Sequence, residues 1–428
     1  MVLLCISLSS CGTGTTDDEI AANLENYESL YGETSTGDTE TEYVSTVTTG
    51  VEGIISNDWI IHDNKYYFVT KKMSGLRRTG VEMISYIDLE TGDSHIICPD
   101  PLCEHELDGN CKYVGFGDIF IPEPGVIYSV KKIDQIPPVH QFYKLDLNKG
   151  TVEALHKTNV FQVALIGMDD KKIYFYEMVE ETEGKTTRFK KYYYCLDTET
   201  DQVESFDVIP EPFASEFAFP LFIHDGELYH TTVANQLVKT DLTFQNSTVI
   251  YQLHGNYVGS CFYDTNTDEF YFSVINQDAG IGSVYVYSDG ETKKVQLPDE
   301  NIYSFTLTNS KIYYSTYNPI YYGISSSPNH GRTYDYSGGK LYVTDRETRS
   351  EAELIYDCSG KYLLCNPFVS NYCVLGDYLY FSEVELLHEK EKQMDGTIVE
   401  YHTFSYAFNM SKLRVNLTTG EMKQIVFE

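Results

Sequence analysis

Short apolar runs separated by polar turns recur along the chain from about residue 50 to its carboxyl end. The clearest copy is 221–253: it begins with Leu221-Phe222-Ile223, turns at His224-Asp225-Gly226, and continues through three further short runs. Apolar runs of this length between Gly, Asp and Asn residues are typical of β-strands joined by tight turns. Each copy therefore predicts four strands, which is the content of one propeller blade.

The second predicted strand of each copy carries a tyrosine that follows an apolar residue or another tyrosine. The seven tyrosines are Tyr67, Tyr128, Tyr174, Tyr229, Tyr271, Tyr313 and Tyr380. The third strand of most copies ends in an acidic turn, as in Asp88-Leu89-Glu90-Thr91-Gly92. Aromatic residues suit a pleated, half-buried surface, so these tyrosines are expected to pack between blades.

Seven copies predict an all-β protein built as a single β-propeller of seven four-stranded blades. A count of six or eight blades is the alternative, because the Cys-rich segment 98–117 could contain further strands. One such sheet buries neither face alone, whereas sheets stacked around an axis bury both. We expect the propeller to occupy residues 45–428, with the Cys-rich segment as an insertion, and residues 43–49 could add a strand to the final blade.

The formal net charge of −33 changes which partners are plausible. Binding to nucleic acid depends on attraction to phosphates, so a chain this acidic is not expected to bind DNA or RNA. The same charge favours solubility, and we expect a monomer.

The amino terminus predicts a lipid anchor. Residues 2–8 are apolar, and Leu8-Ser9-Ser10-Cys11 is similar to a bacterial lipobox, in which the cysteine is lipidated. No Lys or Arg precedes the apolar run, so residues 1–11 depart from a complete signal, as a start codon placed too far downstream would explain. Residues 12–44 are acidic and rich in Thr, Gly and Ser, as in a disordered tether. We expect Cys11 to hold the protein on the outer side of the cell membrane, with the lipid as its only membrane contact.

Three cysteines and a histidine lie within fourteen residues, at Cys98, Cys103, His105 and Cys111. Three thiols and an imidazole could form a tetrahedral Cys3His zinc site, which would be structural. A disulfide within this segment is an equally good prediction for an exported protein, with the third thiol free or paired elsewhere. In either case the segment is expected to be stapled between the first two blades.

The run from Tyr86 to Gly92, followed by Cys98, Pro101, Cys103, His105 and Cys111, resembles a broad group of propeller lipoproteins. These are proteins of unknown function, related to the low-density-lipoprotein-receptor type of propeller and exported by Gram-positive gut anaerobes. The resemblance covers about residues 50–428. It implies a propeller outside the cytoplasm, and it supplies no activity and no catalytic residues.

Function on a propeller usually resides in its loops. The long segment 317–339 carries aromatic and polar residues that could bind a sugar, because rings stack on apolar C–H faces while polar groups bond hydroxyls. The candidate ligand-binding residues are Tyr317, Tyr321, Tyr322, His330, Arg332 and Tyr334. The alternative is that the loop folds its tyrosines onto the propeller. A basic loop with Lys71, Lys72, Arg77 and Arg78 could recognise an acidic group, or be simply solvated.

The chain contains none of the usual catalytic motifs for serine hydrolases, zinc proteases, P-loop enzymes or dinucleotide-binding enzymes. Asp264-Thr265-Asn266-Thr267-Asp268 imitates the start of a calcium loop, but Glu269 stands where glycine is needed, so it predicts a turn. We therefore expect a surface-anchored, extracytoplasmic binding protein for glycans or peptides, and not an enzyme. A glycan-active hydrolase or lyase, and a scaffold for envelope protein assembly, are the alternatives.

Overall fold

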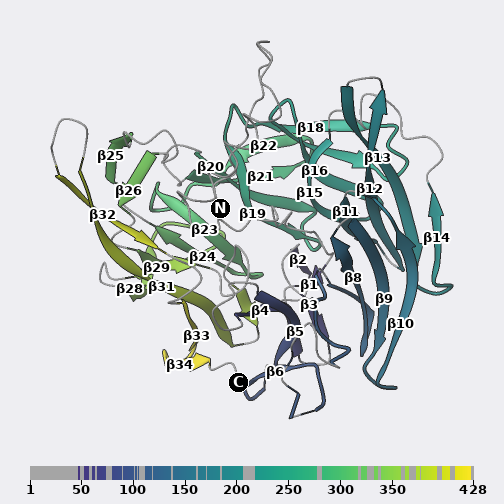
Figure 1. The fold of residues 1–428 in the computed structure, drawn as a ribbon. Helices are drawn as coiled ribbons and strands as arrows, with labels where there is room; N and C mark the ends of the chain where they lie inside the picture. The colour runs from purple at the N-terminus through teal and green to yellow at the C-terminus, as the bar shows by residue number, and fades with distance from the viewer. Residues whose placement is uncertain are drawn as a thin grey trace. The chain divides into compact units, whose positions relative to one another are not determined.

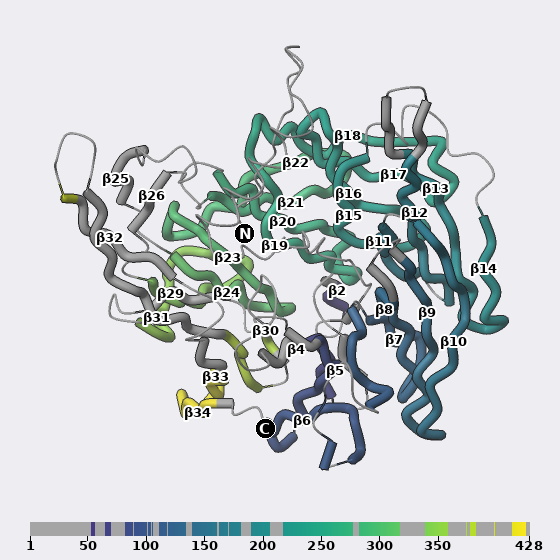
Figure 2. Tube along the Cα trace, viewed as in Figure 1, coloured from purple at the N-terminus to yellow at the C-terminus, as the bar shows by residue number. Residues whose placement is uncertain are grey.

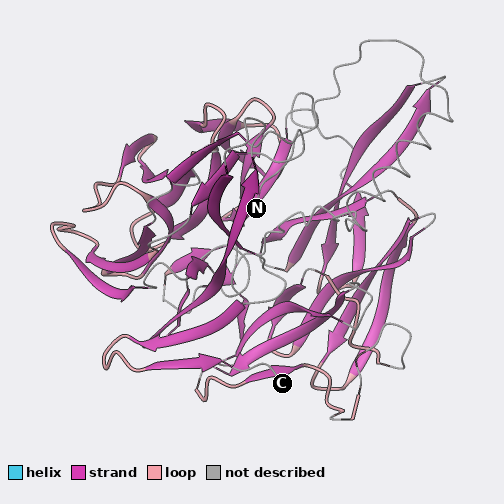
Figure 3. Ribbon diagram, turned by 60° about the vertical axis from the view of Figure 1, so that its left-hand side comes forward, coloured by secondary structure: helices cyan, strands magenta, loops and turns pink. Residues whose placement is uncertain are grey.

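The computed structural model describes residues 47–48, 53–56, 60–62, 65–73, 80–88, 90–100, 102–103, 105, 111–117, 119–135, 138–160, 162–169, 171–183, 186–205, 217–276, 282–316, 320–324, 332–335, 339–357, 362–365, 373–375, 377–392, 398–404 and 410–425. All of them belong to the unit that runs from Glu42 to Glu428. The regular secondary structure of these described residues consists of β-strands alone (Figures 1 and 3). Among these residues, no helix has the length and apolar character to cross a membrane.

Most strands follow one another as antiparallel sets, with four strands in each of the first six sets, and each set forms a sheet or part of one (Figure 1). Four sets are separate four-stranded sheets. These are β3 (Ile60–His62), β4 (Lys65–Met73), β5 (Gly80–Asp88) and β6 (Ser94–Ile96); β7 (Ile119–Glu123), β8 (Val126–Gln135), β9 (Pro138–Asp146) and β10 (Thr151–Thr158); β11 (Gln162–Asp169), β12 (Lys172–Glu183), β13 (Thr186–Asp197) and β14 (Gln202–Ser205); and β15 (Phe217–His224), β16 (Glu227–Thr232), β17 (Gln236–Asp241) and β18 (Ser247–Gln252).

A ten-stranded and a six-stranded sheet contain the rest of the repeat. The ten-stranded sheet holds a fifth set and a sixth set, which are joined by one residue pair, Gly282 with Ile302. The fifth is β19 (Tyr257–Asp264), β20 (Glu269–Ile275), β21 (Gly282–Ser288) and β22 (Glu291–Lys294), and the sixth is β23 (Ile302–Leu307), β24 (Lys311–Thr316), β27 (Lys340–Asp345) and β28 (Ala352–Asp357). The six-stranded sheet contains β29 (Tyr362–Cys365), β30 (Cys373–Leu375), β31 (Tyr378–Lys392), β33 (Met410–Asn416) and β34 (Met422–Ile425), with the additional strand β32 (Ile398–Phe404). The predicted all-β propeller arrangement is confirmed. The count of seven blades is not shown by the sheet pairing of the described strands, because the fifth and sixth sets share one sheet.

The repeated tyrosine has one structural role in all copies. Each of the seven is the third residue of its second strand, and each pairs with the third strand two residues before that strand ends. Each is buried, with at most 8 % of its surface exposed. Packing within and between the sheets is the expected use of such rings, so the tyrosine pattern identifies the core.

Each set has two different ends. The turn end holds the connections between first and second strands and between third and fourth strands. The loop end holds the connections between second and third strands and those that lead to the next set. Turn ends of neighbouring sets contact each other, as Lys144 does with Asp201 and Arg346 with Asp264. Because the sets are aligned in this way, their loop ends lie together on the other side of the propeller.

The last set closes against the first. Arg414 of β33 donates a hydrogen bond to the Thr91 carbonyl oxygen at 2.9 Å, and Tyr380 of β31 packs in the same core cluster as Tyr66 and Ile87. Figure 2 shows the end of the chain, in yellow, near β4 to β6.

The expectation that residues 43–49 add a strand to the final blade is wrong for the part that the structure describes. β1 (Val47–Thr48) pairs with β2 (Ile54–Ser56), and β2 pairs with β19 of the fifth set. Burial explains this placement, because Ile54 is fully buried beside Phe262 and Phe305.

Candidate functional site

Cys98, Cys103, His105 and Cys111 converge on one point. Their four candidate ligand atoms, three sulfurs and one imidazole nitrogen, all lie within 4.8 Å of one another. The cluster belongs to the connection that leaves β6 and leads to β7. The chain bends sharply there, since His105 has the left-handed φ of 54° and the Cys103 amide bonds the Asp100 carbonyl oxygen at 3.2 Å. The sequence prediction that these residues gather is therefore confirmed.

The segment after the cluster is attached to both the first and the second set. Val114 pairs with Met83 of β5, and the Gly115 amide donates to the Glu82 carbonyl oxygen at 2.7 Å. Tyr113 and Phe116 are buried in the core cluster that contains β4 and β7 residues. The cluster is thus held at the junction of two blades, as the sequence predicted for this insertion.

The sulfur atoms of Cys98 and Cys111 are 3.8 Å apart. A disulfide bond requires about 2.05 Å, so these thiols are not bonded to each other. Cys98, Cys103 and Cys111 are all free, and each is half-buried. Burial, together with the neighbouring Cys103 and Cys98 thiols, raises the pKa of the Cys111 thiol to about 12. The group could hold a metal ion, and its donors are those that zinc prefers.

The second candidate region is the long segment after β24. It contains a two-stranded sheet, β25 (Ile320–Ile324) and β26 (Arg332–Asp335), in which Tyr321 pairs with Tyr334 and Ile324 with Arg332. Tyr322 lies in β25, whereas Tyr317 and His330 lie outside the described residues. The structure therefore brings the backbones of Tyr321 and Tyr334 opposite each other.

A second insertion lies beside the first. β31 extends beyond its set and pairs with β32, from the pair of Leu386 with Phe404 to the pair of Lys392 with Ile398. β26 of the first insertion contacts β32. Both insertions connect a second strand to a third strand, so both emerge at the loop end. The basic loop predicted between residues 71 and 81 belongs to the same end: Lys71 and Lys72 lie in β4, and Arg77 and Arg78 lie outside the described residues.

The loop end also carries exposed apolar side chains on the described strands and turns. Val233 in the connection from β16 to β17 is 63 % exposed, and Phe219 near the start of β15 is 42 % exposed. Tyr257 at the start of β19, Ile133 near the end of β8 and Ile398 at the start of β32 are exposed as well. The sequence pattern does not identify these residues as exposed, because an apolar residue in or beside a strand has the pattern of a core residue until the strand is placed.

The turn end is built differently, from a repeated turn with a side-chain cap. The carboxylate oxygen of Asp197 accepts hydrogen bonds from the Glu199 and Thr200 amides at 2.9 and 3.0 Å. Other third strands end in the same way. The side-chain oxygen of their last residue accepts hydrogen bonds from the backbone amides two and three residues later, as for Asp88, Asp345 and Asn416. Side chains that satisfy turn amides in this way are structural.

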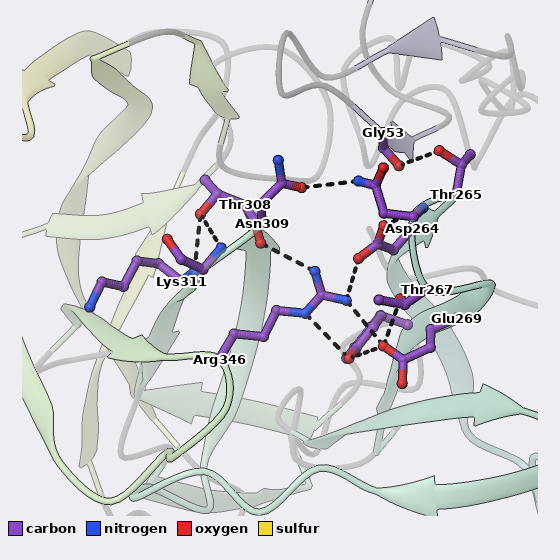
Figure 4. A network of polar contacts seen from close by, with 12 residues as sticks. Gly53, Asp264, Thr265, Thr267, Glu269, Thr308, Asn309, Lys311 and Arg346 are labelled. Atoms are coloured by element: carbon purple, nitrogen blue, oxygen red, sulfur yellow. Dashed lines mark hydrogen bonds and ion pairs between the residues drawn. The ribbon is translucent and has the colours of Figure 1, made fainter.

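A buried polar network at the turn end links the fifth and sixth sets (Figure 4). The Arg346 guanidinium contacts the carboxylates of Asp264 at 2.5 Å and Glu269 at 3.1 Å, and the side chains of Arg346 and Asp264 are at most 8 % exposed. Asp264 is thus an ion-pair partner, and the prediction of a turn at 264–268 in place of a calcium loop agrees with this geometry. No sequence motif marks Arg346, because the side chains that it contacts, Tyr271, Glu269 and Asp264, lie 75 or more residues away. Its other partner, the Thr308 carbonyl oxygen, lies 38 residues away.

No family model matches the chain, and no curated protein matches it by sequence. Solved structures match it in fold. A puromycin hydrolase aligns with a TM-score of 0.50 at 11 % identity, over 90 % of this chain and 55 % of that one. An acylaminoacyl peptidase from Pyrococcus horikoshii aligns at 0.49 and 13 % identity, over 91 % and 53 %. The β-propeller domain of the Trilobed protease from Pyrococcus furiosus aligns at 0.46 and 10 % identity, over 88 % and 97 %. The chain spans about half of the puromycin hydrolase and acylaminoacyl peptidase chains, and at this identity the likeness shows the propeller fold alone.

Proposed function

We propose that the protein is an extracytoplasmic, surface-anchored binding protein that recognises a glycan or a peptide at its loop end. The observation that carries the proposal is the difference between the two ends. The turn end consists of short turns, many of them capped by a side chain. The β25–β26 and β31–β32 insertions lie at the loop end, as do most of the described exposed apolar side chains that are not on fourth strands. Rings and apolar side chains that stay exposed beside polar loops are the usual material of a binding surface.

A binding experiment tests this proposal directly. The full chain carrying Cys11→Ala, which removes the predicted lipid, is screened against an array of neutral and anionic glycans and of peptides. We expect a ligand whose binding is lost when Tyr321→Ala and Tyr334→Ala are combined. Tyr192→Ala is the matched control, because Tyr192 is an exposed tyrosine in the middle of β13. Binding that survives the double substitution would contradict the assignment to the 317–339 loop.

The proposed location rests on Cys11 and on the acidic composition of residues 12–44. In the native cell, Cys11→Ala should move the protein from the membrane fraction to the medium. A Cys5→Ala variant is the control, since Cys5 lies inside the predicted signal. Unchanged partitioning of the Cys11 variant would contradict a lipid anchor.

Any metal held by the cysteine cluster is proposed to be structural in this binding protein. Four protein donors complete a tetrahedral coordination shell and leave no position for a substrate. The enzymatic alternative gains no support from the peptidase matches, because a shared propeller fold does not carry activity. If no glycan or peptide on the array binds, the alternative of a scaffold that binds envelope proteins would be favoured.

A further inference from the structure

The Cys98–Cys111 cluster shows three properties together: its four donors meet at one point, its thiols are free, and it joins two blades. We propose that Cys98, Cys103, His105 and Cys111 bind one zinc ion, and that this ion fixes the connection between β6 and β7 to the first two blades. The inference goes beyond ligand recognition at the loop end and does not depend on it.

The spacing of the sulfur atoms distinguishes a metal site from a disulfide. Zinc binds cysteine sulfur at about 2.3 Å, so two sulfurs at neighbouring corners of a tetrahedron lie about 3.8 Å apart. The Cys98 and Cys111 sulfurs are separated by 3.8 Å. This pair therefore has the separation of two zinc-bound thiolates, and all four donor atoms lie within 4.8 Å of one another.

The donor types select the metal. Thiolates are soft ligands that favour zinc over calcium and magnesium, which prefer oxygen. Three thiolates around a divalent cation leave one net negative charge. The Lys131 ammonium donates to the carbonyl oxygen of Val114 at 2.8 Å, and Val114 packs beside Cys111, so this positive charge lies near the cluster and is placed to balance it.

The surrounding packing explains why the ion would be structural. Cys98 and Cys111 contact the core cluster of the first two sets, and Cys111 also packs beside Met83 and Val114. Tyr113 and Phe116 enter that core directly after Cys111. A metal ion that links Cys98 to Cys111 therefore fixes the position at which the buried residues Tyr113 and Phe116 begin. The free energy of metal binding then contributes to the stability of the fold.

Metal content is the first measurement. The full chain, expressed with zinc and purified under reducing conditions, should contain about one zinc ion by elemental analysis. Cobalt exchanged into the site should give the visible absorption of tetrahedral coordination and a thiolate charge-transfer band. Cys103→Ser and His105→Ala should lose the metal, whereas His105→Cys, which supplies a fourth thiolate, should retain it. Cys195→Ala, which removes a buried free thiol in β13, should leave the zinc content unchanged.

Removal of the ion tests its structural role in the unaltered chain. A chelator should lower the melting temperature and increase amide exchange at residues 111–117 and in β5, with less change in β15–β18. Protein that is expressed with zinc and contains no metal, or whose cluster cysteines form a disulfide on peptide mapping, would overturn the proposal. Zinc that can be removed without any change in exchange at residues 111–117 would overturn the structural role.

Discussion

His230 is a buried histidine whose protonation state matters for stability. It is 2 % exposed and packs against the Phe217 ring. Its ring nitrogens contact the Thr231 carbonyl oxygen at 3.1 Å and the Thr240 hydroxyl at 2.9 Å. Burial, with a smaller contribution from the nearby Lys191 ammonium, lowers the pKa of His230 to about 4. The unfolded chain binds this proton near pH 6.5, so the folded state is favoured most when the ring is neutral.

The direction in which pH changes the folding stability follows from this difference in proton binding between the folded and unfolded states. The contribution of His230 to stability is fully present above about pH 6.5 and is lost progressively as the pH falls towards 4. Between pH 7.5 and 5.5 the loss should be about 1 kcal/mol. Burial also lowers the pKa values of His140 and His224, so they add to the loss.

Urea unfolding at the two pH values measures this effect. His230→Gln should show a smaller loss of stability on acidification than the unaltered protein. An equal pH dependence in His230→Gln and the unaltered protein would contradict the assignment.

Residue-level chemistry was only partly predictable from sequence. The spacing of Cys98, Cys103, His105 and Cys111 was enough to identify the four donors. It was not enough to choose between a disulfide and a metal, because that choice depends on sulfur–sulfur distances that local sequence does not determine. Arg346 carried no signal, since its carboxylate partners come from another blade.

At the level of the strands, the repeated acidic turn has a defined physical role. Hydrogen bonds from the Thr200 and Glu199 amides lower the pKa of Asp197, and Asp345 is lowered in the same way by the Thr348 and Glu347 amides. Asn416 makes the same pair of bonds without a charge. The turn therefore requires a side-chain acceptor oxygen on the last strand residue, two residues before the first turn amide that it bonds. A carboxylate is not required, because the Asn416 amide oxygen serves as well.

This comparison predicts the order of two substitutions at Asp197. Asp197→Ala should lower the urea midpoint, because the Glu199 and Thr200 amides lose their acceptor. Asp197→Asn should stay closer to the unaltered protein at neutral pH. The carboxylate's contribution is present above its unfolded pKa and lost as the pH falls through the folded value, so the Asn variant should also lose that part of the acid dependence.

The converse substitution, Asn416→Asp, is the matched control, since it should keep both hydrogen bonds and acquire an acid dependence. Equal midpoints for Asp197→Ala and Asp197→Asn at neutral pH would show that the acceptor oxygen does not stabilise the turn.

The repeat made the strands and their order predictable, because the buried tyrosines and turn residues are local signals. The position of the 317–339 insertion was also predictable, because it is a long segment that interrupts the repeat. The position of β2 was not, because its neighbours in β19 lie more than 200 residues away in the sequence. Its short apolar run, Ile54-Ile55, gives no information on which blade it joins.

For the whole molecule, the chain's two ends stabilise the ring in different ways. The carboxyl-terminal set meets the first set through Arg414 and Lys423, the latter 3.6 Å from Asp93. The amino-terminal strands act elsewhere: β2 extends the fifth set, and β1 contacts β3 of the first set. Two distant blades are therefore joined by β1 and β2.

Removal of these strands should destabilise the propeller. A chain that begins at residue 57 lacks β1 and β2 and exposes the edge of β19. A chain that begins at residue 45 keeps both strands and lacks only the predicted signal and tether. The shorter chain should lose at least about 2 kcal/mol, the value of burying one Ile side chain, together with the exchange protection of the amides in Tyr257–Asp264. The longer chain should match the full protein in both measurements.

A point substitution separates packing from the loss of chain length. Ile54 is fully buried among Phe262, Phe305 and their neighbours, so Ile54→Ala should cost about 2–5 kcal/mol. Gly53→Ala should be damaging for a different reason. Gly53 has a φ of 80°, and a Cβ there would lie 2.0 Å from the Asn266 side chain, beside the Thr265 amide that bonds the Gly53 carbonyl oxygen. If the chain starting at residue 57 and the Ile54→Ala variant both unfold at the same urea concentration as the full protein, β2 does not stabilise the ring and the propeller is held by its blade contacts alone.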